Sequence, residues 1–155
     1  MIIYLTHPPL APTDSSGQPS FIDIHDAVIE NVRYMAAVKS FILCDKVIHD
    51  QVDGKHSAIG LFDSIVAPAF PCRHGVFGLI LLVTDIDGPN NFVVELANIE
   101  TQQLVARAQF PTITVKDRTE SSNIAMQFPP LTFPSPGRYE FRLFSNGEFI
   151  DRRDL

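Results

Sequence analysis

The stretch 136-PGRYEFRLFSNGEFI-150 decides the fold class, because its polar and apolar residues alternate strictly. One face of an extended chain here carries Tyr139, Phe141 and Leu143, and the other carries Arg138, Glu140 and Arg142. The following Asn146-Gly147 is a dipeptide that type I′ turns favour, because both central residues need a positive φ. We therefore predict a hairpin with its first face buried in a core and its second face in water.

The start of the same strand carries a Gly-x-Tyr motif, Gly137 to Tyr139. This motif resembles the tyrosine corner of immunoglobulin-like sandwiches, in which the tyrosine hydroxyl bonds to upstream backbone. The chain has no tryptophan, and Cys44 and Cys72 do not have the spacing of an intersheet disulfide. The resemblance therefore implies the broad immunoglobulin-like class and not an antibody domain.

From residue 37 onward, short apolar runs recur between turn residues, which is the pattern of an all-β protein. The runs are VKSFILCDKVIH, SAIGLFDSIVA, HGVFGLILLVTD, FVVELANI, QLVARAQFPTITV, SNIAMQF, GRYEFRLFS and EFIDRR. No helical pattern alternates with them, which argues against βαβ units. We predict an all-β, immunoglobulin-like antiparallel β-sandwich of about seven to eight strands. Four prolines exclude 128-FPPLTFPSPG-137 from a central strand.

Residues 1–34 differ from the rest of the chain. The segment THPPLAPTDSSGQPS is typical of irregular structure. The next segment has apolar residues at Ile24, Val28 and Val32, the spacing of one helical face. We therefore expect two parts, an irregular and then helical extension over 1–34 and a β-sandwich domain over 35–155. Whether the native chain starts at Met35 stays open on these grounds.

The charge and the apolar content of the chain indicate which partners and which compartment to expect. The formal net charge is −6 and no run of Lys or Arg occurs, so nucleic acid and anionic membrane are not expected partners. No segment approaches the ~18–20 apolar residues of a membrane span, and the first residues lack the basic start of a signal peptide. We expect a cytoplasmic protein in which Cys44 and Cys72 are free thiols.

The stretch 44-CDKVIHDQVDGKH-56 concentrates metal ligands and acid/base groups. A two-residue Asp53-Gly54 loop pairs His49 with Ala58, which makes His49 and His56 diagonal neighbours on one face, about 7–8 Å apart at Cα. Two imidazoles can share an ion, although a catalytic zinc site has three protein ligands and a structural one four. We name His49 and His56 as candidate metal ligands; the other interpretation is that both decorate an exposed hairpin.

Other reactive residues give weaker signals. The same register puts Asp45 and Asp63 on opposite faces, so they cannot form an acid/base pair. Cys44 lies in an apolar run and is predicted to be buried and unreactive. Cys72 and His74 are close enough in sequence for a nucleophile and base, but a third, orienting group is missing. The sequence contains no phosphate-binding loop, nucleophile elbow or zinc-binding helix motif.

Four segments resemble those of a family of small uncharacterised bacterial proteins. They are Cys44–Asp50, Gly54–Asp63, Phe70-Pro71 and Phe133–Leu143. The resemblance covers about residues 36–155, and it implies an immunoglobulin-like sandwich with no established activity.

We predict a non-catalytic binding or assembly module that acts on a protein partner through loops or an edge strand. No enzymatic activity, catalytic residue or cofactor is expected. The alternative is a metal- or small-ligand-binding protein that uses His49 and His56, and a hydrolase is the third hypothesis.

Overall fold

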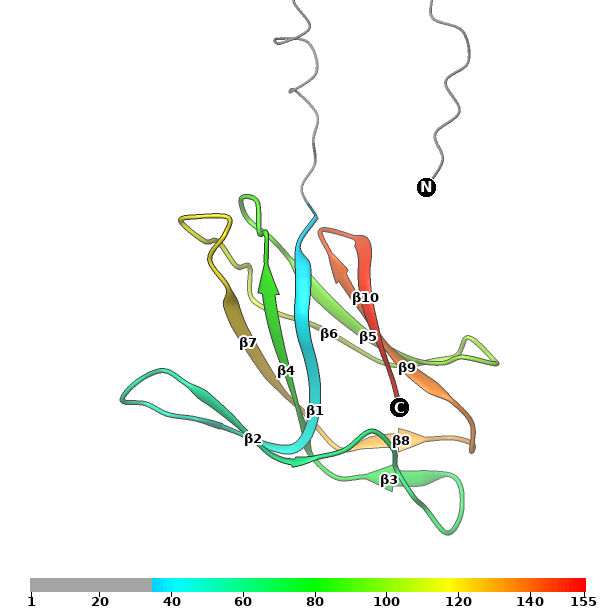
Figure 1. Ribbon diagram of the computed structural model, residues 1–155. Helices are drawn as coiled ribbons and strands as arrows, with labels where there is room; N and C mark the ends of the chain where they lie inside the picture. The colour runs from blue at the N-terminus through cyan, green and yellow to red at the C-terminus, as the bar shows by residue number, and fades with distance from the viewer. Residues whose placement is uncertain (1–34) are drawn as a thin grey trace, which may run out of the picture. The chain divides into compact units, whose positions relative to one another are not determined.

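The computed structural model describes residues 35–155, and the expected N-terminal extension with its helix lies outside these residues. The described part contains ten strands and no helix (Figure 1). The strands are β1 Ala37–His49, β2 His56–Leu61, β3 Cys72–His74, β4 Phe77–Thr84, β5 Phe92–Asn98, β6 Leu104–Gln109, β7 Ser122–Phe128, β8 Leu131–Phe133, β9 Tyr139–Ser145 and β10 Glu148–Asp154.

Two four-stranded sheets share one apolar core. The first has the order β2-β1-β4-β7 and the second β10-β9-β5-β6, and every ladder is antiparallel. Their inward side chains form a single buried cluster that includes Leu43, Leu79, Leu81, Phe92, Val94, Leu96, Phe141 and Leu143. The predicted all-β antiparallel sandwich is therefore confirmed.

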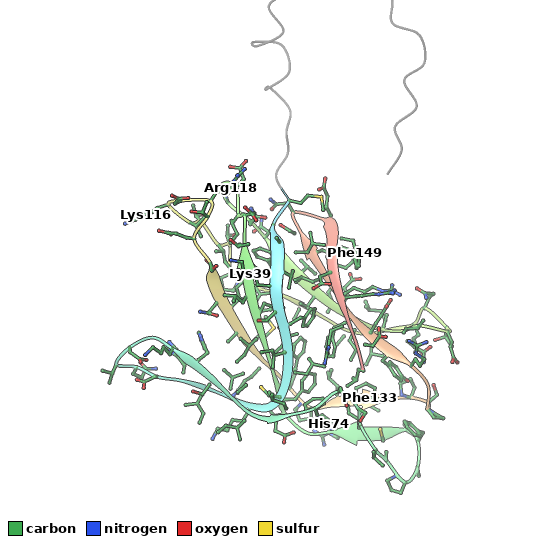
Figure 2. All side chains as sticks on the ribbon, in the orientation of Figure 1. Lys39, His74, Lys116, Arg118, Phe133 and Phe149 are labelled. Atoms are coloured by element: carbon green, nitrogen blue, oxygen red, sulfur yellow. The ribbon has the colours of Figure 1, made fainter. Side chains whose placement is uncertain are left out.

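A third, two-stranded sheet joins β3 to β8 at one end of the molecule. His74 from β3 and Phe133 from β8 mark this end in Figure 2. The sequence did not predict these two strands, because each is only three residues long. The proline-rich segment nevertheless stays out of the central strands as predicted, since β8 pairs with β3 alone in the described part of the chain.

The hairpin of β9 and β10 forms where the alternation predicted it. Tyr139, Phe141 and Leu143 are all buried. The Tyr139 hydroxyl donates to the carbonyl oxygen of Ser135 at 2.7 Å, which is the predicted bond to upstream backbone. Asn146 and Gly147 have φ values of 49° and 86°, as the type I′ turn requires.

The opposite face of β9 is less exposed than predicted. Glu140 was expected in water, but it is 6% exposed. Its Oε1 lies 2.6 Å from Nε of Arg142, and its Oε2 lies 3.6 Å from Nη1 of Arg152. Because β9 is an interior strand between β10 and β5, arginines on its own face can cover the carboxylate and pair with it.

Strand β1 belongs to two ladders in succession. Its first half pairs with β4 and its second half with β2, and Cys44 is paired with both Gly78 and Leu61. Past Cys44 the β1–β2 hairpin leaves the sandwich (Figure 1). Two contacts hold its base: Val47 packs closely over Gly78, and Nε2 of Gln127 donates to the carbonyl oxygen of Val47 at 3.3 Å.

The predicted register of this hairpin is wrong by two residues. His49 is paired directly with His56, not with Ala58, and residues 50–55 connect the strands. The amide of Asp50 donates to the Lys55 carbonyl oxygen at 2.8 Å, and the amide of Gly54 donates to the Asp50 carbonyl oxygen at 3.0 Å. The Asp50 carboxylate also accepts a bond from the Val52 amide at 2.7 Å. These bonds stabilise a longer turn than the Asp53-Gly54 dipeptide alone predicts.

Candidate functional site

The first half of β1 has an open edge. In the described part of the chain, β2 covers β1 only from Cys44 onward. The amide of Phe62 donates to the Leu43 carbonyl oxygen at 3.3 Å, so the polar backbone groups of Leu43 point to this edge. Backbone direction alternates along an antiparallel strand, so the N–H and C=O of Phe41 point the same way. Within residues 35–155 they have no backbone partner there.

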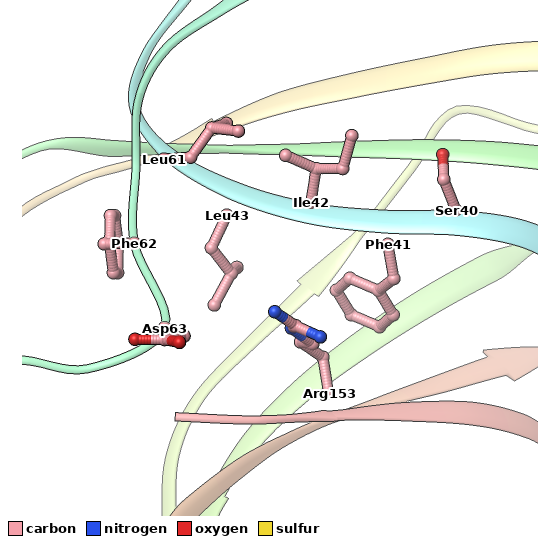
Figure 3. A pocket seen from close by; sticks show the side chains of 8 residues that line it. All are labelled: Ser40, Phe41, Ile42, Leu43, Leu61, Phe62, Asp63 and Arg153. Atoms are coloured by element: carbon pink, nitrogen blue, oxygen red, sulfur yellow. The ribbon is translucent and has the colours of Figure 1, made fainter.

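The first half of β1 lies next to β10, the edge strand of the second sheet (Figure 1), and a groove runs along this edge. We call it the β1–β10 groove; its volume is about 420 Å³. Figure 3 shows the lining residues, which are Ser40, Phe41, Ile42, Leu43, Leu61, Phe62, Asp63 and Arg153. Phe41 packs on Phe141 of the core with ring centroids 6.4 Å apart, and Leu61 is 68% exposed at the rim. Phe41 and Leu61 therefore give the groove apolar surface.

Two charged side chains line the same groove. Arg153 is the ladder partner of buried Phe141, so it lies on the inner face of β10, and Figure 3 shows it extending toward β1. Among residues 35–155, neither Arg153 nor Asp63 has an ion-pair partner, whereas neighbouring Arg152 lies near Glu140. Within the described residues, the β1–β10 groove thus combines open backbone groups, apolar side chains and one charge of each sign.

The sequence did not single out Arg153. Simple alternation from Phe149, which is 50% exposed, places Arg153 on the outer face of β10. An irregularity in the ladder between Phe149 and Asp151 reverses that phase and turns Arg153 inward. A bulge of this kind adds one residue to a strand and re-aims the side chains beyond it.

The predicted metal ligands do come together. His49 and His56 share one face as predicted, but as direct partners and not as diagonal neighbours. Their rings are stacked, with centroids 4.8 Å apart and planes 22° from parallel. Within residues 35–155, no His, Cys, Asp or Glu joins them to make a group of three potential ligands. Their role in metal binding stays a prediction.

The histidine pair lines a second hollow of about 250 Å³, which we call the corner pocket. Its lining residues are Val47, His49, His56, Ala125, Met126 and Gln127. The Nδ1 atom of His49 lies 3.5 Å from Nε2 of Gln51. The Nδ1 atom of His56 is buried and has no hydrogen-bond partner in the described part of the chain. The corner pocket therefore brings two imidazoles next to an amide side chain.

The cysteines are both free thiols, as predicted. Cys44 is fully buried, its thiol donates to the Lys46 carbonyl oxygen at 3.4 Å, and burial raises the pKa of this thiol. Cys72 is half-buried on β3. Its neighbour His74 packs against Phe62 and Phe77, with ring centroids 5.4 and 5.7 Å away. The imidazole of His74 is thus part of an aromatic cluster.

The two aspartates of the apolar runs, Asp45 and Asp63, have different surroundings. Asp45 packs over Gly60, whose φ of 70° is in the left-handed region that favours glycine. Asp63 lines the β1–β10 groove. Cys44 is paired with Leu61, whereas the predicted register, in which His49 faces Ala58, would pair Cys44 with Asp63.

The fold and these two sites define residues 35–155 as a small all-β sandwich with one open strand edge within the described part of the chain. The chain belongs to a family of unknown function, DUF6941, whose model matches residues 39–155. This match covers nearly the segment that the sequence motifs indicated. A comparison with curated proteins found no match. Among the described residues, no helix is long and apolar enough to cross a membrane.

Proposed function

We propose that the protein is a non-catalytic binding module of the bacterial cytoplasm with an immunoglobulin-like sandwich. Its partner is another protein, which supplies an extended segment that pairs along the open edge of β1. The observation that carries this proposal is the backbone of Phe41, which has no partner within residues 35–155 on the side of the β1–β10 groove. Strand addition of this kind draws its affinity from main-chain hydrogen bonds and its specificity from alternating side-chain pockets.

The groove also suggests the chemistry of the segment. Every second side chain of an added strand faces the sandwich, where Phe41 and Leu61 offer apolar surface. A carboxylate in the segment can pair with Arg153, which has no such partner within residues 35–155. We therefore expect alternating apolar residues and at least one Asp or Glu.

Within residues 35–155, the usual protections of an edge strand are weak between Ser40 and Leu43. Natural sheets guard open edges with lysine, proline, bulges or a covering segment. Lys39 is the one cation in the first half of β1, and its Nζ lies 3.2 Å from Oγ of Ser121. Ser121 directly precedes β7, which forms the other edge of this sheet, so Lys39 extends away from the open edge. The β1 ladder is irregular between Val38 and Ser40, so the regular open stretch starts at Ser40.

Selection of displayed peptides on the full chain tests this proposal. Enriched peptides should alternate apolar residues and carry a carboxylate, and their binding should shift the backbone NMR signals of Ser40 to Leu43. Leu61→Lys should abolish binding by adding a charge at the apolar rim, and Arg153→Glu should abolish it by reversing the recognised charge.

Val52→Lys is the matched control, because Val52 is 96% exposed in the hairpin turn and does not line the groove. It should bind the peptides as the wild type does. Failure to enrich any peptide, or equal binding by the Leu61 and Arg153 variants, would rule the proposal out.

A further inference from the structure

The strand ladder itself holds His49 and His56 together. His49 ends β1, His56 begins β2, and each is the direct partner of the other. Direct antiparallel partners have Cβ atoms about 4.5–5.5 Å apart on one face of the sheet. The two rings, with centroids 4.8 Å apart and nearly parallel planes, are therefore held side by side, and turning the side chains out of the stack points two nitrogens at a common ion.

The hydrogen bonds around the rings leave ligand nitrogens available. No hydrogen bond in residues 35–155 fixes the tautomer of His56 Nδ1, so a proton there leaves a lone pair on Nε2. For His49, turning the Gln51 amide lets its oxygen accept a bond from Nδ1–H, which again frees Nε2. Proteins usually orient a metal-binding histidine by a partner on its second ring nitrogen, and Gln51 can be that partner for His49.

The corner pocket supplies a third donor and room for water. Gln127 lines the pocket, and its Nε2 is engaged with the Val47 carbonyl oxygen, so its Oε1 remains as a further ligand atom. The hairpin from Asp45 to Ala58 carries three carboxylates and two lysines, a net charge of −1 with neutral histidines. This local negative charge favours a cation.

We infer that His49 and His56 bind one divalent transition-metal ion of the copper, nickel and zinc group, with Gln127 and water as the remaining ligands. Imidazole suits all three ions, and the Irving–Williams order ranks Cu²⁺ above Ni²⁺ and Zn²⁺ at such a site. This site is separate from the β1–β10 groove and does not depend on the proposed function.

Titration of the full chain with Cu²⁺, followed by calorimetry and electron paramagnetic resonance, tests the inference. The expected result is one ion per chain with hyperfine coupling to two imidazole nitrogens. His49→Gln and His56→Gln should each weaken Cu²⁺ binding by at least about tenfold, and the double variant should lose it. Gln127→Leu should weaken binding less, because water can take the place of its oxygen.

The matched control is the His7→Gln/His25→Gln variant, which keeps the two ladder histidines and should bind Cu²⁺ as the wild type does. Circular dichroism of each metal-free variant verifies the fold. The inference is overturned if the wild type binds no Cu²⁺, if the His49/His56 double variant binds it equally well, or if the control loses it.

Discussion

Replacement of Gly78 by alanine probes the contact that sets the direction of the β1–β2 hairpin. A Cβ atom at Gly78 would lie 2.5 Å from Cγ2 of Val47, 3.1 Å from Sγ of Cys44 and 3.2 Å from the backbone nitrogen of Val47. Carbon atoms in contact prefer about 3.5–4.0 Å, so either the side chain of Val47 or the backbone of β1 must shift. The side chain of Val47 is the first obstacle, and the backbone behind it is the second.

Two opposing effects set the size of the change. Overpacking a core position costs about 1–3 kcal/mol. Alanine also restricts the unfolded chain, which stabilises a protein by about 0.4–1 kcal/mol where the backbone conformation suits it. Gly78 does not have a positive φ, so this gain applies. We expect a net loss of about 1–2 kcal/mol in the free energy of unfolding.

Urea denaturation of the full chain, followed by circular dichroism, measures this loss as a lower midpoint at constant slope. The Val47→Ala/Gly78→Ala double variant is the informative comparison, because Val47→Ala removes the closest obstacle. Its loss in the free energy of unfolding should be smaller than the sum of the two single losses by about 1 kcal/mol. The steric reasoning would be refuted if Gly78→Ala were as stable as the wild type, or if the losses of the two single variants added up to that of the double variant.

Three further predictions follow from single contacts. Tyr139→Phe should lower the free energy of unfolding by about 1–3 kcal/mol in urea, because a partly buried carbonyl oxygen loses its hydroxyl donor; an unchanged midpoint would contradict this. A thiol reagent should label Cys72 in the native chain and Cys44 only after unfolding, so a Cys72→Ser variant should not react until denatured. The Asp53 side chain should titrate by NMR below the ordinary range of aspartate, because its bond to the Lys55 side chain lowers its pKa. The stability that this contact gives is present above the ordinary pKa of aspartate and disappears as the pH falls through the lowered pKa. An Asp53 that titrates equally in a Lys55→Ala variant would count against this cause.

Local pattern was sufficient to predict the hairpin of β9 and β10 in the second sheet. In β9, alternation identified the buried residues, and the Gly-x-Tyr motif identified the hydrogen bond of Tyr139. Both features depend on residues close together in sequence. The burial of Glu140 was missed because alternation assigns a side chain to a face, whereas tertiary packing decides what covers that face.

The sequence predicted that β1 and β2 form a hairpin, but it predicted the wrong pairing of their residues. Asp-Gly signals a two-residue turn, but the Asp50 carboxylate and the Asp50 backbone close a longer one. A shift of two residues preserves the side-chain faces, which is why His49 and His56 still share a face. A shift of one residue would have separated them.

The β1–β10 groove was beyond prediction from the sequence. It exists because two strands from the opposite ends of the domain meet at one side of the sandwich, and because a bulge in β10 turns Arg153 inward. Neither the meeting of the sheets nor the position of a bulge leaves a local pattern. The sequence suggested an edge strand as the binding surface without indicating which edge.

The double pairing of β1 has a consequence for the order of folding. Its ladder with β2 joins neighbours in sequence and needs only a short loop to close, whereas its ladder with β4 must close a much longer one. Local pairings of this kind form within microseconds, and topologies rich in distant pairings fold over milliseconds to seconds. Cys44 takes part in both ladders, so the fast and the slow stages of folding meet at a single residue of one strand.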